Sequence, residues 1–326
     1  MIEILLKEWI EQVKYYIHLI ADYSIKESQV GAVLDDVLNL SGKMLRSKLL
    51  LLCAFLGSNW KNNKEKICKL AAMVELTHLA SLIHDDIVDD SPYRRGKVSV
   101  QGKYGKDAAV FAGDFLIARI FYYGAVENLN EAVSILSKTV EYMCIGEIEQ
   151  DLCRYQEDIS EKKYFENIER KTAALFQAAS YIGAKEAGCS EKIIQKLGLF
   201  VKNLGLMFQL KDDILDFTSN SKELGKETHK DFQNGIYTFP VIMTLKNLKA
   251  KEVLLPIMRK NKEEKLSLAE ILQLQNYIIQ FGGIEASYEK IKYLSNINRQ
   301  LIKELGQNSK ITVYLEKILN DLEVEN

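Results

Sequence analysis

The chain has 326 residues, of which 47% are hydrophobic and 27% are charged, and its formal net charge is −2. This length allows one large helical domain or two smaller ones, and the near-neutral charge gives no general reason to expect a nucleic-acid partner, whose binders show a basic face. The five cysteines form no CxxC pair, so neither a zinc site nor a disulfide framework is indicated, and reduced thiols in a cytoplasmic protein are expected.

The N-terminal stretch MIEILLKEWIEQVKYYIHLI mixes charged residues with apolar ones at helical spacing. It predicts an amphipathic helix and not a signal sequence. The longest apolar run, residues 49–56, is far shorter than the ~18 residues of a membrane span. A soluble, cytoplasmic protein is therefore expected.

Apolar residues recur at helical spacing through most of the chain, and hardly any segment alternates as a β-strand does. Polar breaks separate roughly ten predicted helices, and no change of composition marks a second domain. The breaks fall at residues 59–66, 91–97, 157–163, 218–235 and 259–265. The sequence predicts an all-α fold, with residues 1–326 in a single helical bundle. The break at 218–235 is long enough to be a functional or disordered loop.

Near the N-terminus, the segment SGKMLRSKLLLL (41–52) places Lys43 and Arg46 just before an apolar helix. Main-chain N–H groups and side-chain charge can together hold an anion there. Further along, His78 lies seven residues before Asp85 and shares its helical face. This histidine is either a packed core residue or a polar residue that faces substrate, and the sequence leaves both open.

Two acidic clusters share one spacing, DDIVD at 85–89 and DDILD at 212–216. On a helix, positions i and i+4 lie on one face, about 5–6 Å apart, so each cluster pairs its first and last carboxylates. Such carboxylates repel by roughly 4 kcal/mol at an effective dielectric of ~20, which calls for a cation between them. Hard oxygen donors without cysteine suit Mg²⁺ shared with substrate phosphates. The alternative is a solvated acidic helix face.

Basic residues follow both clusters, as expected of diphosphate ligands. They are Arg94, Arg95 and Lys97 after the first cluster and Lys226 and Lys230 after the second. Lys171 falls on the same predicted helical face as the apolar Ile168 and Leu175, which is costly unless it faces an anion. A lysine that snorkels from a core helix is the alternative.

These motifs, in this order, resemble those of the trans-isoprenyl (polyprenyl) diphosphate synthases over residues 41–240, with the two acidic clusters as the family's two aspartate-rich motifs. The other matching elements are GKMLR (42–46), RRGK (94–97), AGDFL (112–116), GEIEQ (146–150), KTAALF (171–176), GLMFQLKDD (205–213), GK (225–226) and YTFP (237–240). The family usually has a second glycine, an arginine and a proline where this chain has Ser41, Met44 and Ser47.

The resemblance implies an isoprenoid synthase fold with a deep central cavity and a head-to-tail prenyltransferase that joins isopentenyl diphosphate to an allylic prenyl diphosphate. It implies that three Mg²⁺ are held by Asp85, Asp89 and Asp212, with Asp86, Asp213 and Asp216 as further ligands or outer partners. It implies that the allylic diphosphate binds Arg94, Lys171, Gln209 and Lys226. It implies that isopentenyl diphosphate binds Lys43, Arg46, His78 and Arg95. Thr172 would help to stabilise the carbocation, and the catalytic set would be Asp85, Asp89, Lys171, Asp212 and Lys226.

Short-chain family members usually carry an aromatic residue four or five positions before the first motif, where this chain has Ser81 and Ala80, with Thr77 deeper along the helix. Continued burial of apolar product then predicts a long chain, about C30 to C40, of the kind in quinone side chains. Within the family the arrangement resembles bacterial heptaprenyl and octaprenyl synthases.

Three alternative functions and several possible partners stay open from the sequence. A farnesyl or geranylgeranyl diphosphate synthase would make a shorter product, a terpene cyclase would need no isopentenyl diphosphate site, and a non-catalytic partner subunit would not need intact acidic clusters. The family implies a homodimer, although some heptaprenyl synthases require a small second subunit. The lipid product implies transient association with a membrane.

Overall fold

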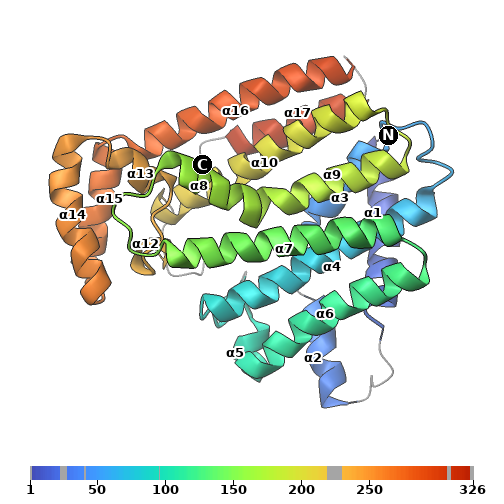
Figure 1. Ribbon diagram of the computed structural model, residues 1–326, viewed down its shortest axis with the longest axis horizontal. Helices are drawn as coiled ribbons and strands as arrows, with labels where there is room; N and C mark the ends of the chain where they lie inside the picture. Colours follow the sequence, from blue (N-terminus) through green and yellow to red (C-terminus); the bar gives the residue numbers. More distant parts are fainter. Residues whose placement is uncertain are drawn as a thin grey trace. The chain divides into compact units, whose positions relative to one another are not determined.

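The computed structural model describes residues 2–22, 28–39, 42–94, 96–218, 230–306 and 310–323. These residues are almost entirely α-helical (Figure 1), which confirms the predicted all-α class. The chain divides into two compact units. Unit 1 comprises Met1–Val140 and Leu175–Leu199, and unit 2 comprises Glu141–Ala174 and Phe200–Asn326. The predicted deep cavity concerns both units and stays a prediction.

Unit 1 is built around one long central helix, α4 (Lys64–Val88), which packs against α1, α3 and α6. Its other helices are α1 (Ile2–Ile20), α2 (Gln29–Leu38), α3 (Leu45–Ala54), α5 (Val100–Tyr104), α6 (Lys106–Val126), the first part of α7 (Asn130–Leu152), most of α9 (Ala174–Glu186) and the start of α10 (Glu191–Thr218). The first aspartate-rich motif therefore sits at the end of the best-packed helix of this unit.

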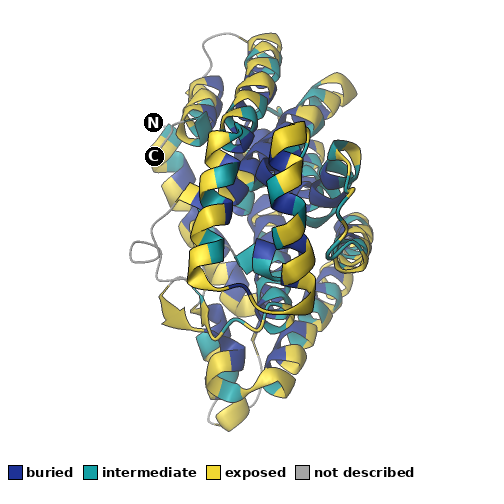
Figure 2. Ribbon diagram, turned by 90° about the vertical axis from the view of Figure 1, so that its left-hand side faces the viewer, coloured by how far each residue is buried: buried dark blue, intermediate teal, exposed yellow. Residues whose placement is uncertain are grey.

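Helix α1 is amphipathic, as the sequence predicts, and buries one side against the rest of unit 1. Trp9 on that side is 1% exposed and meets Phe55 edge-on, with ring centroids 4.9 Å apart. The ring of Trp60 lies 5.1 Å from that of Phe55 and completes the cluster. Figure 2 shows the general pattern, with helices buried on one side and exposed on the other.

Unit 2 contains a second set of helices arranged around α16 (Gly283–Leu305), which packs against α13, α15 and α17. Its remaining elements are α8 (Glu161–Ile168), a π-helical turn η1 (Glu169–Ala173), α12 (Lys230–Gln233), α13 (Phe239–Thr244), α14 (Leu248–Glu263), α15 (Leu268–Gln280), α17 (Lys310–Glu323) and the rest of α7 and α10. A core cluster that includes Phe217, Phe232 and Tyr237 links the end of α10 to α14 and α15.

Several local predictions differ from the structure. The predicted breaks at 59–66 and 157–163 end early, because α4 begins at Lys64 and α8 at Glu161. The predicted break at 259–265 is wrong for its first five residues, because α14 continues to Glu263. Lysine and glutamate are good helix formers, and Asn261 donates a hydrogen bond to the Phe232 carbonyl, so the charged run stays helical. The break at 91–97 contains an unpredicted hairpin of β1 (Tyr93–Arg94) and β2 (Lys97–Val98).

Among the described residues, two helices, α4 and α6, are long and apolar enough to cross a membrane by length and composition alone. This is weak support for a membrane span, since core helices of soluble proteins pass the same test. In α4, 72% of the apolar window is buried, as in a core helix. In α6 only 39% is buried, so this helix presents apolar residues at the surface of unit 1.

The close approach of α9 to α3 depends on a glycine, and this generates a stability prediction. A Cβ at Gly183 would overlap the Leu50 carbonyl oxygen, whereas a Cβ at Gly198 in α10 meets nothing within 4 Å. Gly183→Ala should lower the free energy of unfolding by about 1–3 kcal/mol through overpacking. Gly198→Ala should leave it unchanged or raise it by up to about 1 kcal/mol through helix propensity. Urea unfolding of both variants measures this, and equal midpoints would contradict it.

Candidate active site

The first acidic cluster forms the C-terminal end of α4. The Asp89 N–H donates to the Asp85 carbonyl oxygen at 2.9 Å, so the helical hydrogen-bond pattern extends to Asp89. Asp85 and Asp89 therefore keep the predicted i, i+4 relation, and both are half-buried. The next residue, Asp90, has φ of 48°, a left-handed conformation of the kind that ends helices.

Asp86 points another way from its neighbours and is 3% exposed. The Arg94 Nε donates to both of its carboxylate oxygens at 2.8 Å, and Nη2 lies 2.8 Å from Oδ1. The hairpin that carries Arg94 is thereby fixed to the end of α4. The structure thus brings two predicted site residues together, and Arg94 neutralises a buried carboxylate.

Helix α6 holds the same end of α4 from the side. Gly113 leaves room for the His84 ring, whose Nε2 atom a Cβ at this position would overlap. The His84 Nε2 atom lies 3.4 Å from the carboxylate of Asp114 in α6. From the neighbouring helix α5, the Gln101 side-chain amide donates to the Asp86 carbonyl oxygen at 2.6 Å. The glycine and aspartate of the AGDFL element therefore help to position the first acidic cluster.

Arg46 and His78, both predicted to bind isopentenyl diphosphate, meet in unit 1. The Arg46 Nη1 lies 2.9 Å from the His78 Nε2, and the guanidinium stacks 4.5 Å from the centroid of the Phe176 ring. The half-buried His78 is therefore bonded to Arg46, which is itself predicted to bind an anion. This contact favours the interpretation of His78 as a polar, substrate-facing residue over that of a packed core residue. Lys43 is exposed just before α3. Met44, between Lys43 and the first residue of α3, has a φ of 51°.

Ser41 and Ser47 both depart from the family pattern, and the structure describes only Ser47. Ser41 lies outside the described residues. Ser47 is fully buried, and its Oγ lies 2.8 Å from a Glu75 carboxylate oxygen and 3.0 Å from the Ala71 carbonyl oxygen, so its single hydrogen is shared between these two acceptors. A hydroxyl that neighbours Arg46 in sequence thus tethers α3 to the central helix α4, which a proline in its place could not do through its side chain.

The second acidic cluster lies within α10, and its three aspartates differ in burial. Asp212 is exposed and Asp216 is half-buried, at positions i and i+4 of a continuous helix. Asp213 is 1% exposed. Burial raises its pKa to about 7, although hydrogen bonds from Gln209 and Tyr164 act in the opposite direction. The two clusters thus share a pattern in which the second aspartate is buried and the outer two are less so.

The turn between α8 and α9 is π-helical, and neighbouring helices hold its polar residues. Lys171 Nζ lies 3.0 Å from the Glu147 carboxylate, Arg170 pairs with Glu149, and Lys202 Nζ lies 2.6 Å from Glu169. The prediction that Lys171 continues the apolar face of a regular helix is wrong, because the π turn interrupts the 3.6-residue period. Lys171 does face an anion, the Glu147 carboxylate.

Thr172 and Gln209, also predicted to contact substrate, are bonded to each other. The Thr172 hydroxyl donates to the Gln209 side-chain oxygen at 2.9 Å, and the Gln209 amide donates to Asp213 at 3.0 Å. The η1 turn is thus connected to the second acidic cluster within unit 2. Two predicted residues lie outside the described part of the chain, Arg95 and Lys226.

Sequence reasoning missed several residues that touch this site. Glu147, Tyr164, Glu75 and Phe176 pair with, bond to or stack on predicted residues or their partners. Glu147 and Phe176 fall inside the matching elements GEIEQ and KTAALF, which was the only signal for them. Nothing in the sequence pattern singles out Tyr164.

The clusters fit a divalent metal that is completed by substrate. Among the described residues, no three His, Cys, Asp or Glu side chains are grouped closely enough to hold a metal ion alone. Each cluster instead offers carboxylate oxygens from two less buried aspartates. Mg²⁺ usually binds one or two carboxylates and takes its other ligands from water and phosphate oxygens.

The predicted chain-length residues lie along α4 before the first cluster. Ala80 and Thr77 are buried, and Ser81 is half-buried. The Thr77 hydroxyl donates to the Met73 carbonyl at 2.9 Å, and the Ser81 hydroxyl donates to the His78 carbonyl at 2.8 Å. Both hydroxyls are therefore satisfied by their own helix.

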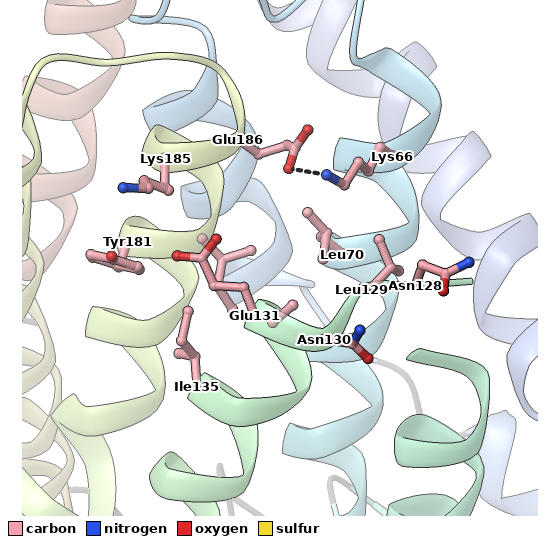
Figure 3. Close-up of a pocket in the computed structure, with 12 residues that line it drawn as sticks. Lys66, Leu70, Asn128, Leu129, Asn130, Glu131, Ile135, Tyr181, Lys185 and Glu186 are labelled. Atoms are coloured by element: carbon pink, nitrogen blue, oxygen red, sulfur yellow. Dashed lines mark ion pairs between the residues drawn. The ribbon is translucent and has the colours of Figure 1, made fainter. Parts of the chain in front are cut away.

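A pocket of about 180 Å³ lies in unit 1 between the start of α4, the start of α7 and the end of α9 (Figure 3). Its lining carries two cations and two acids, Lys66, Lys185, Glu131 and Glu186. Lys66 and Glu186 form an ion pair at 2.7 Å. This balanced charge does not suit a diphosphate, and none of the lining residues belongs to the predicted site.

Comparison with known proteins agrees with this geometry. The family model described as polyprenyl synthetase matches residues 27–275. The chain is 34% identical over 265 residues to heptaprenyl diphosphate synthase component 2 of Geobacillus stearothermophilus, covering 80% of each chain. It is 36% identical over 260 residues to a geranylgeranyl diphosphate synthase of Sulfolobus acidocaldarius, covering 76% of this chain and 78% of that one.

A solved structure is also similar along almost the whole length. It is a polyprenyl synthase from Caulobacter crescentus in complex with calcium and isoprenyl diphosphate, with a TM-score of 0.88, 28% identity and coverage of 99% and 96%. The chain therefore belongs to the polyprenyl synthetase family of prenyltransferase enzymes. This family is metal-dependent and uses isoprenyl diphosphates as substrates.

The pair of Asp86 and Arg94 generates a prediction about stability. Arg94→Ala would leave a buried carboxylate without its cation, which should cost roughly 3 kcal/mol of unfolding free energy. The matched control is Lys97→Ala at the paired, exposed hairpin position, where less than about 0.5 kcal/mol is expected. Urea unfolding compares them, and the double variant Asp86→Asn/Arg94→Ala should recover part of the loss. Equal effects of the two alanine variants would refute the neutralising role of Arg94.

Proposed function

We propose that this chain condenses isopentenyl diphosphate with an allylic prenyl diphosphate and releases a long-chain all-trans polyprenyl diphosphate for quinone side chains. The observation that carries the proposal is the duplicated acidic motif, each copy with two less buried carboxylates one helical turn apart. The match to a heptaprenyl diphosphate synthase component over 80% of both chains supports it.

The six aspartates have two kinds of role in this proposal. Asp85, Asp89, Asp212 and Asp216 would hold three Mg²⁺, which when bound would supply positive charge to the diphosphate leaving group. Asp86 and Asp213 act behind them, because protein groups already bind both of their carboxylate oxygens. The sequence left Asp86 and Asp213 as either metal ligands or outer partners of the metals, and this proposal assigns both to the second role.

The allylic diphosphate takes its remaining charge compensation from side chains. Lys171 and Lys226 bind it as point charges, and Lys171 exchanges its Glu147 partner for a phosphate oxygen. Arg94 keeps Asp86 through Nε and Nη2 and offers Nη1 to the diphosphate. Gln209 donates to the same group, and the Thr172 hydroxyl dipole helps to stabilise the allylic cation.

Isopentenyl diphosphate binds at a separate cationic group, formed by Lys43, Arg46, His78 and Arg95. The bond between Arg46 and His78 and the stacking of Arg46 on Phe176 support this group, because both contacts orient the guanidinium fork before substrate arrives. No side chain is assigned the final proton, which by family resemblance goes to the released diphosphate.

The proposal of a long polyprenyl product rests on the small residues that precede the first aspartate-rich motif. Thr77, Ala80 and Ser81 carry no bulky group, and the two hydroxyls are satisfied by their own helix, so a hydrocarbon chain beside them leaves no polar group unpaired. Each added isoprene buries more apolar area, which favours continued elongation. A farnesyl or geranylgeranyl synthase is the second candidate, and one relative carries the latter name.

Assembly is proposed as a cytoplasmic homodimer of one polyprenyl synthetase domain, residues 1–326. The family match extends over both units, which supports a single domain. Helix α6 offers a surface for a second copy, because Phe111, Tyr122 and Val126 along it are 71%, 61% and 59% exposed. Whether a small accessory subunit also binds is decided by the activity of the purified chain alone. The lipid product would bring the enzyme to a membrane transiently.

The central test is a turnover assay on the purified chain, with its mass determined by light scattering. With Mg²⁺, isopentenyl diphosphate and farnesyl diphosphate, long polyprenyl diphosphates are expected, and Asp85→Asn and Asp212→Asn should each lower kcat/KM about 100-fold or more. Asp107→Asn, an exposed aspartate in the first turn of α6, is the matched control.

Other outcomes identify the alternatives. Cyclic hydrocarbons formed without isopentenyl diphosphate would indicate a terpene cyclase. Inactivity of the chain alone, with activity restored by a second protein, would indicate an obligatory partner. Turnover that is unaffected by Asp85→Asn and Asp212→Asn would refute the metal assignment.

Product length is tested at Ser81, which accepts a ring more readily than the fully buried Ala80, where overpacking costs about 1–3 kcal/mol. Ser81→Phe should shorten the product by at least one isoprene unit, because the ring blocks growth along α4. Ser134→Phe, on the exposed side of α7, should leave the product distribution unchanged. Chromatography of the products by length measures both. An unaltered distribution for Ser81→Phe would refute the channel assignment.

A further inference from the structure

Tyr164 in α8 makes a buried hydrogen bond to the second acidic cluster. Its hydroxyl donates to Asp213 Oδ2 at 2.6 Å, and the residue is buried. The ring is fixed by Phe165 and Phe239, whose centroids lie 5.1 Å and 5.4 Å away. The hydroxyl is therefore held at one place by its ring packing and cannot follow the carboxylate elsewhere.

The other oxygen of Asp213 accepts from the Gln209 amide at 3.0 Å. Because the amide nitrogen is used in this bond, the side-chain oxygen of Gln209 turns toward Thr172, whose hydroxyl donates to it at 2.9 Å. One hydrogen-bonded series thus runs from Tyr164 through Asp213 and Gln209 to Thr172. It sets the rotamer of two residues that the proposed function assigns to substrate.

These side-chain hydrogen bonds also connect two separate elements, the η1 turn and helix α10. Thr172 belongs to the π-helical turn η1, whereas Gln209 and Asp213 lie on α10. A π turn is an irregular segment whose register must be held by outside contacts. Lys171, the residue before Thr172, lies in the same turn, so these bonds also hold the backbone that carries it.

We propose that Tyr164 is a positioning residue of the prenyl transfer reaction, which acts through Asp213 to orient Gln209 and Thr172 for the allylic diphosphate, and that Asp213 is a support for this series and not a metal ligand. The inference rests on the proposed function. It assigns a role in catalysis to a tyrosine outside both aspartate-rich motifs.

Removing the hydroxyl should affect one substrate and not the other. In Tyr164→Phe, Asp213 loses a donor and no longer fixes Gln209, so kcat/KM for the allylic diphosphate should fall about 10–100-fold. The KM for isopentenyl diphosphate should stay within about twofold, since Arg46 and His78 in unit 1 are unchanged. Tyr237→Phe is the matched control, because this buried tyrosine bonds to the Met258 carbonyl and has no contact with the series.

The experiment combines steady-state kinetics with calorimetric binding of a non-reactive farnesyl diphosphate analogue in Mg²⁺. Tyr164→Phe should weaken analogue binding about tenfold or more, and Tyr237→Phe should not, even if both lower the melting temperature alike. Equal kinetics and equal binding for the two variants would overturn the inference while the proposed function stands. A wild-type chain that neither binds the analogue nor turns over would remove the proposed function, and the inference with it.

The role of Asp213 is tested separately, with a variant that keeps its volume. Asp213→Asn should leave the Mg²⁺ concentration for half-maximal activity within about twofold of wild type, whereas Asp212→Asn should raise it about tenfold or more. A shift for Asp213→Asn as large as that for Asp212→Asn would make Asp213 a metal ligand and overturn that part of the inference. This variant also serves if Tyr164→Phe does not fold.

Discussion

Carboxylates that lie close together on a helix repel each other unless other groups compensate their charge. In this chain the inner and outer aspartates of each cluster differ in burial, and this difference organises the site. In both acidic clusters the second aspartate turns inward, with Asp86 3% and Asp213 1% exposed. The first and last turn to another side, because positions i and i+4 lie together and position i+1 points about 100° away. Protein groups bond to both oxygens of each inner carboxylate, whereas the proposed function assigns the outer pairs to metal.

The partners of the two inner carboxylates are chemically different. Asp86 receives a full positive charge from Arg94, whereas Asp213 receives neutral donors from Tyr164 and Gln209. Burial accordingly raises the pKa of Asp213 to about 7, and only its hydrogen bonds limit the rise. Each partner lies outside the five-residue cluster, so the contacts that stabilise the two carboxylates also place β1, α8 and the neighbouring residues that are proposed to bind substrate.

Cationic residues assigned to substrate are likewise held before substrate binds. Lys171 is paired with Glu147, and Arg46 is bonded to His78 and stacked on Phe176. Long side chains lose rotamer entropy on binding, and side chains that are already ordered lose less of it. The π turn carries the predicted site residue Lys171, and Gly113 admits the ring of His84, which was not predicted but directly precedes Asp85.

Much of this could be predicted from the sequence alone, because helical period and motif spacing are local properties. The all-α class, the amphipathic first helix, the i, i+4 aspartate pairs and the family followed from residues close together in the chain. The continuation of α14 and the π turn did not. In α14 a charged run suggests a break although its residues favour helix, and the π turn is held by residues distant in sequence. Tyr164 lies 49 positions from Asp213, a separation that no spacing rule reaches. Which aspartate is buried, and which group neutralises it, was decided only by tertiary structure, because burial and hydrogen bonding depend on segments that the fold brings together.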